Sequence, residues 1–331
     1  MVEAIMTSTR VLLLTMTLAC LSLLAPTACA ESFIAAWGSY GIGNDQFKTP
    51  QGVAVGGSGE VYVSDGDNAR VSVFTRDGIY LRSWSVPQVS SGYAQALNIA
   101  VDANDNVYVA ALVDKQIYRF SSAGSLVTQW GTPGSGPGQL GGTFSLAVDA
   151  VGDIYVADHT NHRIQVFTAS GNFVRQWGTS GTGDGQFWRP DGVAIDLAGN
   201  VYVADAGNSR IQKFTNDGTY LTQWGVFGSL EGHFNWPVRL AIGLQGRVYV
   251  VDYLNARVQV FTSEGAFITK WGTAGSSPGQ FYYSIGIAID AIGDIYVADT
   301  GNSRIQKFGS GATPVQGISW GTLKGRYRGA R

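Results

Sequence analysis

A tryptophan recurs at a nearly fixed interval along most of this chain. Successive copies lie 46 or 47 residues apart, and each one opens a Gly-rich run that is followed by a short apolar stretch. The phrase (I/V)-Y-V-x-D-x-x-N-x-R-(I/V)-Q-x-F completes most copies. The recurring residues are Trp37, Trp84, Trp130, Trp177, Trp224 and Trp271. A sustained period of this length indicates that each copy is one supersecondary unit that buries its apolar face against its neighbours.

Each copy contains four strand-like runs, which we name a to d in chain order. In the fourth copy they are residues 192–196, 201–205, 210–215 and 220–224. Val, Ile, Tyr and Phe dominate these runs, as strands favour, and turns that contain Gly separate them. Four antiparallel strands repeated around a ring are the blades of a β-propeller. The sequence therefore predicts an all-β, six-bladed β-propeller over residues 31–308.

The chain begins with a d strand rather than an a strand. Residues 33–37 match the d strands of later copies, whereas the last a-b-c set, residues 285–308, has no well-matched d strand after it. We expect strand 33–37 to complete the last blade and close the ring. Residues 315–320 are the alternative closing strand, but they begin two residues too late, and Gln316 stands where an aromatic residue is needed.

The repeat units resemble a known family. Residues 154–167, 201–214 and 295–308 resemble NHL repeats, and the third copy contains Asn161-His162-Arg163 at the position of the motif. The second copy departs from the pattern with Ala111, Asp114 and Gln116 in place of Asp, Asn and Arg. The resemblance implies a propeller fold and, for function, a binding platform.

The first 30 residues have the pattern of a secretory signal peptide. Arg10 precedes an apolar stretch over residues 11–25, and Ala28-Cys29-Ala30 offers small residues for cleavage. A lipidated Cys29 is the alternative, although Pro26 stands where lipoprotein signals usually have leucine. We therefore expect a secreted or extracytoplasmic protein with no transmembrane segment after cleavage. Both cysteines of the chain lie in this segment, so cleavage after Ala30 leaves no thiol for a disulfide or a nucleophile.

Charge disfavours a nucleic-acid partner. The formal net charge of the chain is −2, and the tail over residues 309–331 carries four basic residues and no acid. The ring itself is therefore acidic, whereas a phosphate backbone requires clustered positive charge.

Residues that recur in most copies are best explained by structure. A single ligand site has no use for six equivalent tryptophans, so we assign them to packing between blades. In the repeated set, exemplified by Asp205, Asn208 and Arg210, we expect Asp and Asn to cap turn groups and Arg to bridge carboxylate and carbonyl oxygens. Asp102, Asp149, Asp196 and Asp290 begin a–b turns and are expected to be turn formers. We expect no metal site, because calcium needs 6–8 converging oxygens and zinc needs several converging ligands.

The residues that the repeat does not explain give the only site hypothesis. In a blade of alternating strands, the d–a and b–c connections share one face, and they are longer and more varied than the others, so recognition is expected there. Aromatic side chains beside polar ones are typical of glycan- and peptide-binding surfaces. The alternative is that these rings pack over the loops or plug the channel. The candidate ligand-binding residues are Trp188, Arg189, Asp191, Trp236, Arg239, Tyr282, Tyr283 and Asn98.

Two functional classes follow. The first is a monomeric secreted binding or scaffold protein, without a cofactor, that recognises a partner protein, peptide or carbohydrate through the d–a and b–c face. The alternative is a metal-dependent lyase or lactonase-type hydrolase, by analogy with six-bladed propeller enzymes. We favour binding, because no nucleophile, base and orienting group can be drawn from these residues and Asp191 is the only acid near the start of an a strand. The ligand and the biological process are not encoded in a recognisable way.

Overall fold

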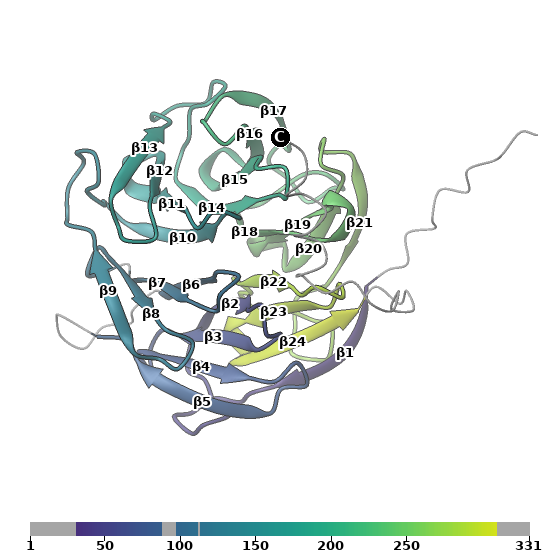
Figure 1. Cartoon of the computed structure of the whole chain (residues 1–331). Helices are drawn as coiled ribbons and strands as arrows, with labels where there is room; N and C mark the ends of the chain where they lie inside the picture. The colour runs from purple at the N-terminus through teal and green to yellow at the C-terminus, as the bar shows by residue number, and fades with distance from the viewer. Residues whose placement is uncertain (1–30, 88–96, 112, 310–331) are drawn as a thin grey trace, which may run out of the picture.

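The computed structural model describes residues 31–87, 97–111 and 113–309. The expected leader, residues 1–30, and the tail after Gly309 lie outside the described residues. The described part of the chain forms six four-stranded antiparallel sheets arranged around a central axis (Figure 1). The structure thus confirms the all-β, six-bladed β-propeller. No helix in the described ranges is long and apolar enough to cross a membrane.

Strands of each type occupy the same place in every blade. The innermost a strands are β2 (Pro50–Val55), β6 (Leu97–Val101), β10 (Thr143–Val148), β14 (Pro190–Ile195), β18 (Pro237–Ile242) and β22 (Ile287–Ile289). The b strands are β3 (Val61–Asp65), β7 (Val107–Ala111), β11 (Ile154–Asp158), β15 (Val201–Asp205), β19 (Val248–Asp252) and β23 (Ile295–Asp299).

The c strands are β4 (Arg70–Phe74), β8 (Gln116–Phe120), β12 (Arg163–Phe167), β16 (Arg210–Phe214), β20 (Arg257–Phe261) and β24 (Arg304–Gly309). The outer d strands are β5 (Tyr80–Ser85), β9 (Leu126–Trp130), β13 (Phe173–Trp177), β17 (Tyr220–Trp224), β21 (Phe267–Trp271) and β1 (Ser32–Trp37). Short 3-10 turns join b to c in four blades, as η1 (His159–Asn161), η2 (Ala206–Asn208), η4 (Tyr253–Asn255) and η5 (Thr300–Asn302), and η3 (Leu244–Gly246) lies between β18 and β19.

In blade four the b and d strands match the predicted ranges, and the c strand β16 ends at Phe214, one residue earlier than predicted. The a strand β14 differs most, because it begins at Pro190, two residues earlier than predicted, and ends at Ile195, one residue earlier. A β-bulge between Pro190 and Gly192 leaves Asp191 unpaired and lets the strand continue. The bulge explains the difference, because hydrophobic alternation does not reveal an inserted residue.

The N-terminal strand closes the ring as predicted. β1 pairs antiparallel with β24, from Ser32 opposite Gly309 to Trp37 opposite Ile305. Phe33 and Phe308 reinforce the pair with an edge-to-face contact at 6.0 Å between ring centroids. The open edge of β24 is therefore occupied by β1. The rival strand, residues 315–320, lies outside the described residues.

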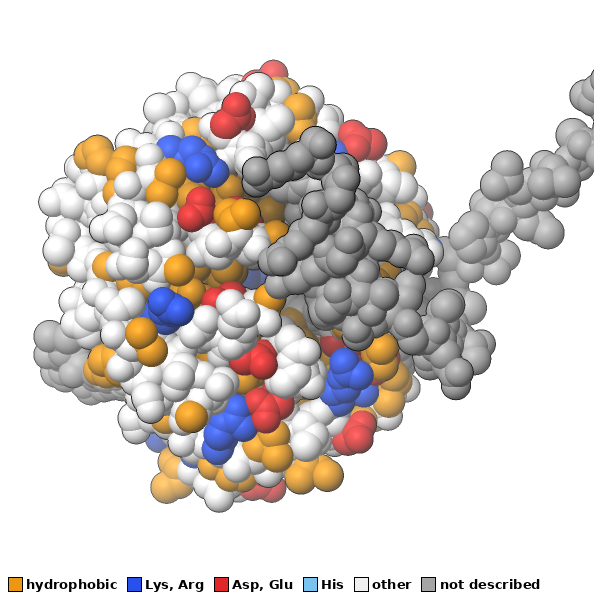
Figure 2. Space-filling model, viewed as in Figure 1, with side chains coloured by type: hydrophobic (Ala, Val, Ile, Leu, Met, Phe, Trp, Pro, Cys, Tyr) orange, Lys and Arg blue, Asp and Glu red, His pale blue; other side chains and the backbone are white. Residues whose placement is uncertain are grey.

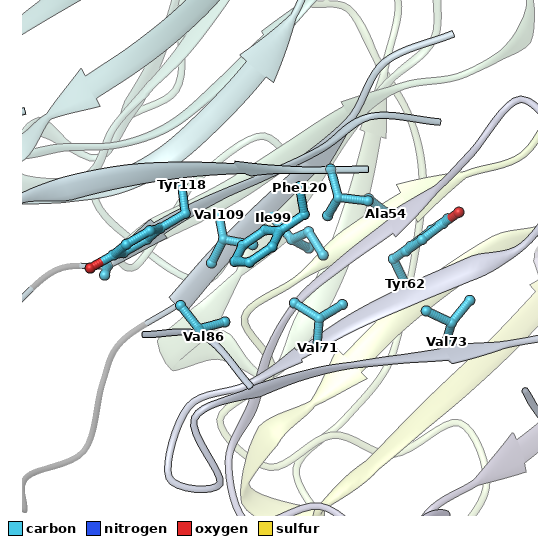
Figure 3. Close-up of a cluster of buried hydrophobic side chains, with 11 residues drawn as sticks. Ala54, Tyr62, Val71, Val73, Val86, Ile99, Val109, Tyr118 and Phe120 are labelled. Atoms are coloured by element: carbon cyan, nitrogen blue, oxygen red, sulfur yellow. The ribbon is translucent and has the colours of Figure 1, made fainter. Parts of the chain in front are cut away.

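The repeat tryptophans pack between blades. Trp37 on β1 lies 6.1 Å from Tyr296 in its own blade and 6.0 Å from Phe74 in blade one, measured between ring centroids. It also covers Gly78, where an added Cβ would lie 2.6 Å from the indole. The other five tryptophans make the equivalent pair of contacts. Figure 3 shows one such junction, where side chains from blades one and two interlock.

The Asp-x-x-Asn-x-Arg set organises the b–c turn. In blade four, Asp205 Oδ1 accepts the backbone N–H of Trp188 at 2.7 Å. Asp205 Oδ2 accepts Asn208 Nδ2 and Arg210 Nε at 2.8 Å each, and Gln212 Nε2 at 3.1 Å. The predicted capping role of this set is confirmed, and the Gln two residues after Arg is an additional member that the sequence analysis missed.

The same arginine fastens the d–a loop. Arg210 donates to the carbonyl oxygens of Thr182, Gly183 and Gln186 at 2.7–2.8 Å. Loops 38–47, 131–140, 178–187, 225–234 and 272–281 share the same isolated bridge between their third and last residues. We expected the d–a loops to vary, but these five keep one backbone conformation and differ in their side chains.

Candidate functional site

Four side chains that depart from the repeat converge at one end of the channel. They are His159, Asp191, Trp236 and Arg239, and we call them the inter-blade cluster. They come from blades three, four and five, on the face of the d–a and b–c connections. At the position of His159, other described copies have Gly66, Ala206, Tyr253 and Thr300.

Asp191 is the centre of the cluster. The bulge in β14 releases this residue from strand pairing, and its side chain is only 5% exposed. Oδ1 contacts Nδ1 of His159, and Oδ2 accepts a hydrogen bond from Nε1 of Trp236 at 2.9 Å. One carboxylate therefore joins blade four to both neighbouring blades, and it holds the imidazole and the indole in fixed orientations.

Arg239 places a buried cation beside this carboxylate. Its side chain starts from β18. The guanidinium nitrogen Nη1 donates hydrogen bonds to the carbonyl oxygens of Asp191 and Val238, the second at 3.1 Å. Burial lowers the pKa of Arg239 to about 10, and the negative charge of Asp191 acts in the opposite direction. The guanidinium remains charged at neutral pH.

Asn98 occupies the position equivalent to Arg239 but has another role. Its Oδ1 accepts the buried backbone N–H of Leu146 at 2.9 Å. In the next blade Ser145 does the same for Val193 at 3.3 Å. These bonds connect successive a strands, so the structure places Asn98 in the wall between blades two and three and not among the partners of the inter-blade cluster.

Trp188 forms a stacked pair at the edge of the cluster. Its ring lies 5.0 Å from that of His162 with an interplanar angle of 13°. The backbone N–H of Arg189 donates to Nδ1 of His162 at 3.0 Å. Burial, then the nearby His159 and Arg189, lower the pKa of His162. Because His159 and His162 belong to the same b–c turn, this turn joins the stacked pair to the cluster.

A tyrosine group extends the aromatic surface towards blade six. Tyr282 and Tyr283 lie 4.5 Å apart, and Tyr253 lies 5.4 Å from Tyr283, measured between ring centroids. Trp236 packs in the same apolar cluster as Tyr253. Tyr282 and Tyr283 are about half exposed. Trp236 and the predicted tyrosines thus lie along one surface, whereas Trp188 is joined to it through the b–c turn of blade three.

Two members of this surface were missed from the sequence. His159 and Tyr253 both follow the repeat Asp directly, at a position where small residues stand in three other described copies. This contrast with the small residues could have identified both positions from the sequence. The contacts of His159 with Asp191 and of Tyr253 with Tyr283 could not be predicted, because they depend on the rotation between neighbouring blades.

A cavity lies at the opposite end of the channel, where the a–b turns meet. It has a volume of about 430 Å³, and its walls include Val101, Val148 and Ile195. The four a–b aspartates line it, but each is engaged by its own turn. Asp196, for example, accepts the backbone N–H groups of Ala198 and Asn200 and the hydroxyl of Tyr202. These aspartates are turn formers, as predicted. The side chains that differ between copies lie on the face of the d–a and b–c connections.

Charge and donor geometry restrict the chemistry of the site. On the described part of the face seen in Figure 2, basic and acidic side chains lie scattered, with no patch of one sign. Within the described ranges, no three His, Cys, Asp or Glu side chains are grouped so as to hold a metal ion. The inter-blade cluster contributes one imidazole and one carboxylate, which is fewer ligands than a protein zinc site uses.

Comparisons with known proteins agree with this architecture. The NHL repeat model matches residues 47–74, 145–167 and 187–214. A family model described as a 6-bladed beta-propeller matches residues 240–318. A comparison with curated protein sequences found no match.

Several solved structures share the fold at low sequence identity. A streptogramin B lyase superimposes with a TM-score of 0.61 at 15% identity, over 83% of this chain and 97% of that chain. A gluconolactonase from Xanthomonas campestris gives a TM-score of 0.59 at 16% identity, over 80% and 87%. A protein of unknown function from Bacteroides thetaiotaomicron gives 0.58 at 19% identity, over 85% and 72%. The family models and the six closed blades together show that the chain is a six-bladed β-propeller that contains NHL repeats.

Proposed function

We propose that this protein is a secreted binding or scaffold protein that recognises a partner protein, peptide or carbohydrate through the face of its d–a and b–c connections. The convergence of His159, Asp191, Trp236 and Arg239 from three adjacent blades carries the proposal. Packing of the ring needs none of them, since other blades close with small or unrelated residues at these positions. Binding sites combine apolar and aromatic side chains with a few precisely placed polar groups. The inter-blade cluster and the half-exposed aromatic rings near it have this composition.

Backbone strain at the rim supports the same conclusion. Arg189, Trp236 and Tyr283 occupy equivalent positions just before an a strand, with φ of 55°, 63° and 52°. The left-handed region favours Gly, and bulky side chains there are uncommon. Strain of this kind is typically retained where the side chain is needed, as at ligand-binding sites.

A propeller lyase or lactonase-type hydrolase is the second candidate. The contact between His159 and Asp191 favours it, because a carboxylate that orients an imidazole is a common arrangement for general-base catalysis. The fold is shared with a streptogramin B lyase and a gluconolactonase. We rank it second because the described residues lack a third metal ligand beside this pair.

Binding through this face is tested with the purified mature ring. Wild type and Trp188→Ala/Trp236→Ala are applied to a glycan array and to a phage-displayed dodecapeptide library. Ligands retained by wild type and lost by the double variant support the proposal, and ligands retained equally by both contradict it. Tyr40→Ala is the matched control, since Tyr40 is an exposed aromatic residue of another d–a loop.

The enzyme candidate and the location need separate measurements. Stoichiometric calcium, magnesium or zinc in the purified protein, together with turnover of a lactone that His159→Gln abolishes, would favour the enzyme. Intact mass of the exported protein distinguishes cleavage after Ala30 from a lipidated Cys29. A mass that retains residues 1–30 in the culture medium would contradict both forms of export.

A further inference from the structure

One d–a loop differs from its equivalents by carrying three exposed apolar side chains. Val226, Phe227 and Leu230 are 56%, 73% and 68% exposed. In the neighbouring loop 178–187 the same positions hold Thr179, Ser180 and Gly183. Leu254 of η4 is also half exposed. We call Val226, Phe227, Leu230 and Leu254 the apolar ridge.

The ridge stands on a fixed backbone. Arg257 donates to the carbonyl oxygens of Ser229, Leu230 and His233 at 2.7–2.8 Å. Phe234 closes the loop by donating its N–H to Val226 at 2.8 Å. Because the loop is already ordered, burying its side chains against a partner requires little further ordering.

The ridge continues into the aromatic surface of the candidate site. Asn255 Nδ2 donates to the carbonyl oxygen of Gly228 at 2.9 Å, so the turn that carries Leu254 lies against the loop. The N–H of Leu254 donates to the carbonyl oxygen of Asn235, the residue before Trp236, at 3.1 Å. Blade five therefore presents aliphatic and aromatic side chains as one surface.

The chemistry of the ridge distinguishes between ligand classes. Sugar recognition uses flat aromatic faces beside hydrogen-bonding groups, whereas three of the four ridge side chains are branched aliphatic and none can form a hydrogen bond. An anionic membrane attracts basic residues, but the charged side chain within loop 225–234 is the acid Glu231, which lies 3.5 Å from Lys270. Exposed apolar side chains on a rigid support are typical of protein interfaces.

We propose that the ligand of this face is a polypeptide segment with apolar side chains, which the ridge buries beside the half-exposed rings of Tyr282 and Tyr283. This inference rests on the proposed binding function of the face. It names the partner class, and it assigns the ridge a direct part in recognition.

The test is a ridge variant that imitates the neighbouring loop. Val226→Thr/Phe227→Ser/Leu230→Gly copies loop 178–187, which has the same bridge, so the backbone should be retained. Tyr40→Ser/Ile42→Thr is the control, because it removes equally exposed apolar side chains from loop 38–47. A dodecapeptide selected on wild type by phage display is synthesised, and its Kd is measured by fluorescence anisotropy for all three proteins.

We expect selected peptides to be rich in aromatic and aliphatic residues, with a Kd weakened at least tenfold by the ridge variant and unchanged by the control. Peptide binding that survives the ridge variant but is lost in Trp188→Ala/Trp236→Ala would overturn the inference and leave the proposed function standing. Glycan binding without peptide binding would also overturn the inference and leave the proposed function standing. Ridge-dependent flotation with phosphatidylcholine–phosphatidylglycerol vesicles, without peptide binding, would overturn the inference. Absence of both peptide and glycan binding would overturn the inference and the proposed function together.

Discussion

Asp191 accepts a hydrogen bond from the indole nitrogen of Trp236 at 2.9 Å, across the boundary between blades four and five. The same carboxylate contacts His159 in blade three. Three blades are thus joined by a side chain that the repeat does not require. The contribution of this bond to the stability of the ring can be measured.

Asp191→Ala is expected to lower the free energy of unfolding by about 1–3 kcal/mol, because it removes the acceptor of the partly buried indole N–H of Trp236 and the carboxylate that contacts His159. Urea unfolding followed by circular dichroism measures the loss. Asp45→Ala, at an exposed loop position, is the control and should not change the midpoint. Equal midpoints for both variants would show that the cluster adds no stability.

Trp37→Ala and Trp130→Ala remove equivalent rings, and each is expected to cost about 3–5 kcal/mol of unfolding free energy. Only Trp37 lies on the strand that closes the ring. Hydrogen exchange should therefore show faster exchange of the β24 amides in Trp37→Ala than in Trp130→Ala. The same β24 exchange in both variants would contradict a special role for β1.

Arg210→Ala should destabilise the ring more than Arg70→Ala. Arg210 Nε lies 2.8 Å from Asp205, whereas Arg70 Nε lies 3.7 Å from Asp65. Removing the close partner leaves a buried carboxylate uncompensated, which costs about 3–5 kcal/mol. Urea unfolding compares the two variants, and an equal or larger loss for Arg70→Ala would refute this ranking.

Protonation of His162 should be visible in the fluorescence of Trp188, which stacks on it at 5.0 Å. The pKa of His162 is lowered, chiefly by burial and next by the nearby His159 and Arg189. The stability that follows is complete above the unfolded pKa of about 6.5 and is lost as the pH falls from there to the folded pKa. A titration difference between wild type and His162→Gln measures the midpoint, and a midpoint above 6.5 would contradict the assignment.

The sequence was sufficient for the architecture because the relevant signals are local and repeated six times. The b strand 201–205 and the d strand 220–224 could be placed to the residue, and the d-strand match at 33–37 identified the closing strand. The bulge at Asp191 escaped detection, since one inserted residue leaves no trace in a hydrophobic pattern. The shared d–a backbone was also hidden, because its hydrogen bonds come from an arginine in the following blade.

The site was only partly readable for a related reason. Trp188, Trp236 and Asp191 stood out as departures from the repeat, but their partners lie in other copies. His159 and Asp191 are 32 residues apart, and Asp191 and Trp236 are 45 apart. Such pairs depend on the angle between blades and on the bulge. The bond from the N–H of Leu146 to Asn98 was hidden for the same reason, because it joins two neighbouring a strands.

Ring closure also constrains how the protein is made. The hydroxyl of Ser32 donates to the carbonyl oxygen of Gly309 at a separation of 277 residues. β1 is synthesised first but can pair only after β24 has been made. Until these two strands pair, β24 has an unpaired edge that can associate with other chains. Such non-local pairing slows folding. A chain that ends before β24 lacks the strand with which β1 pairs, so its ring cannot close.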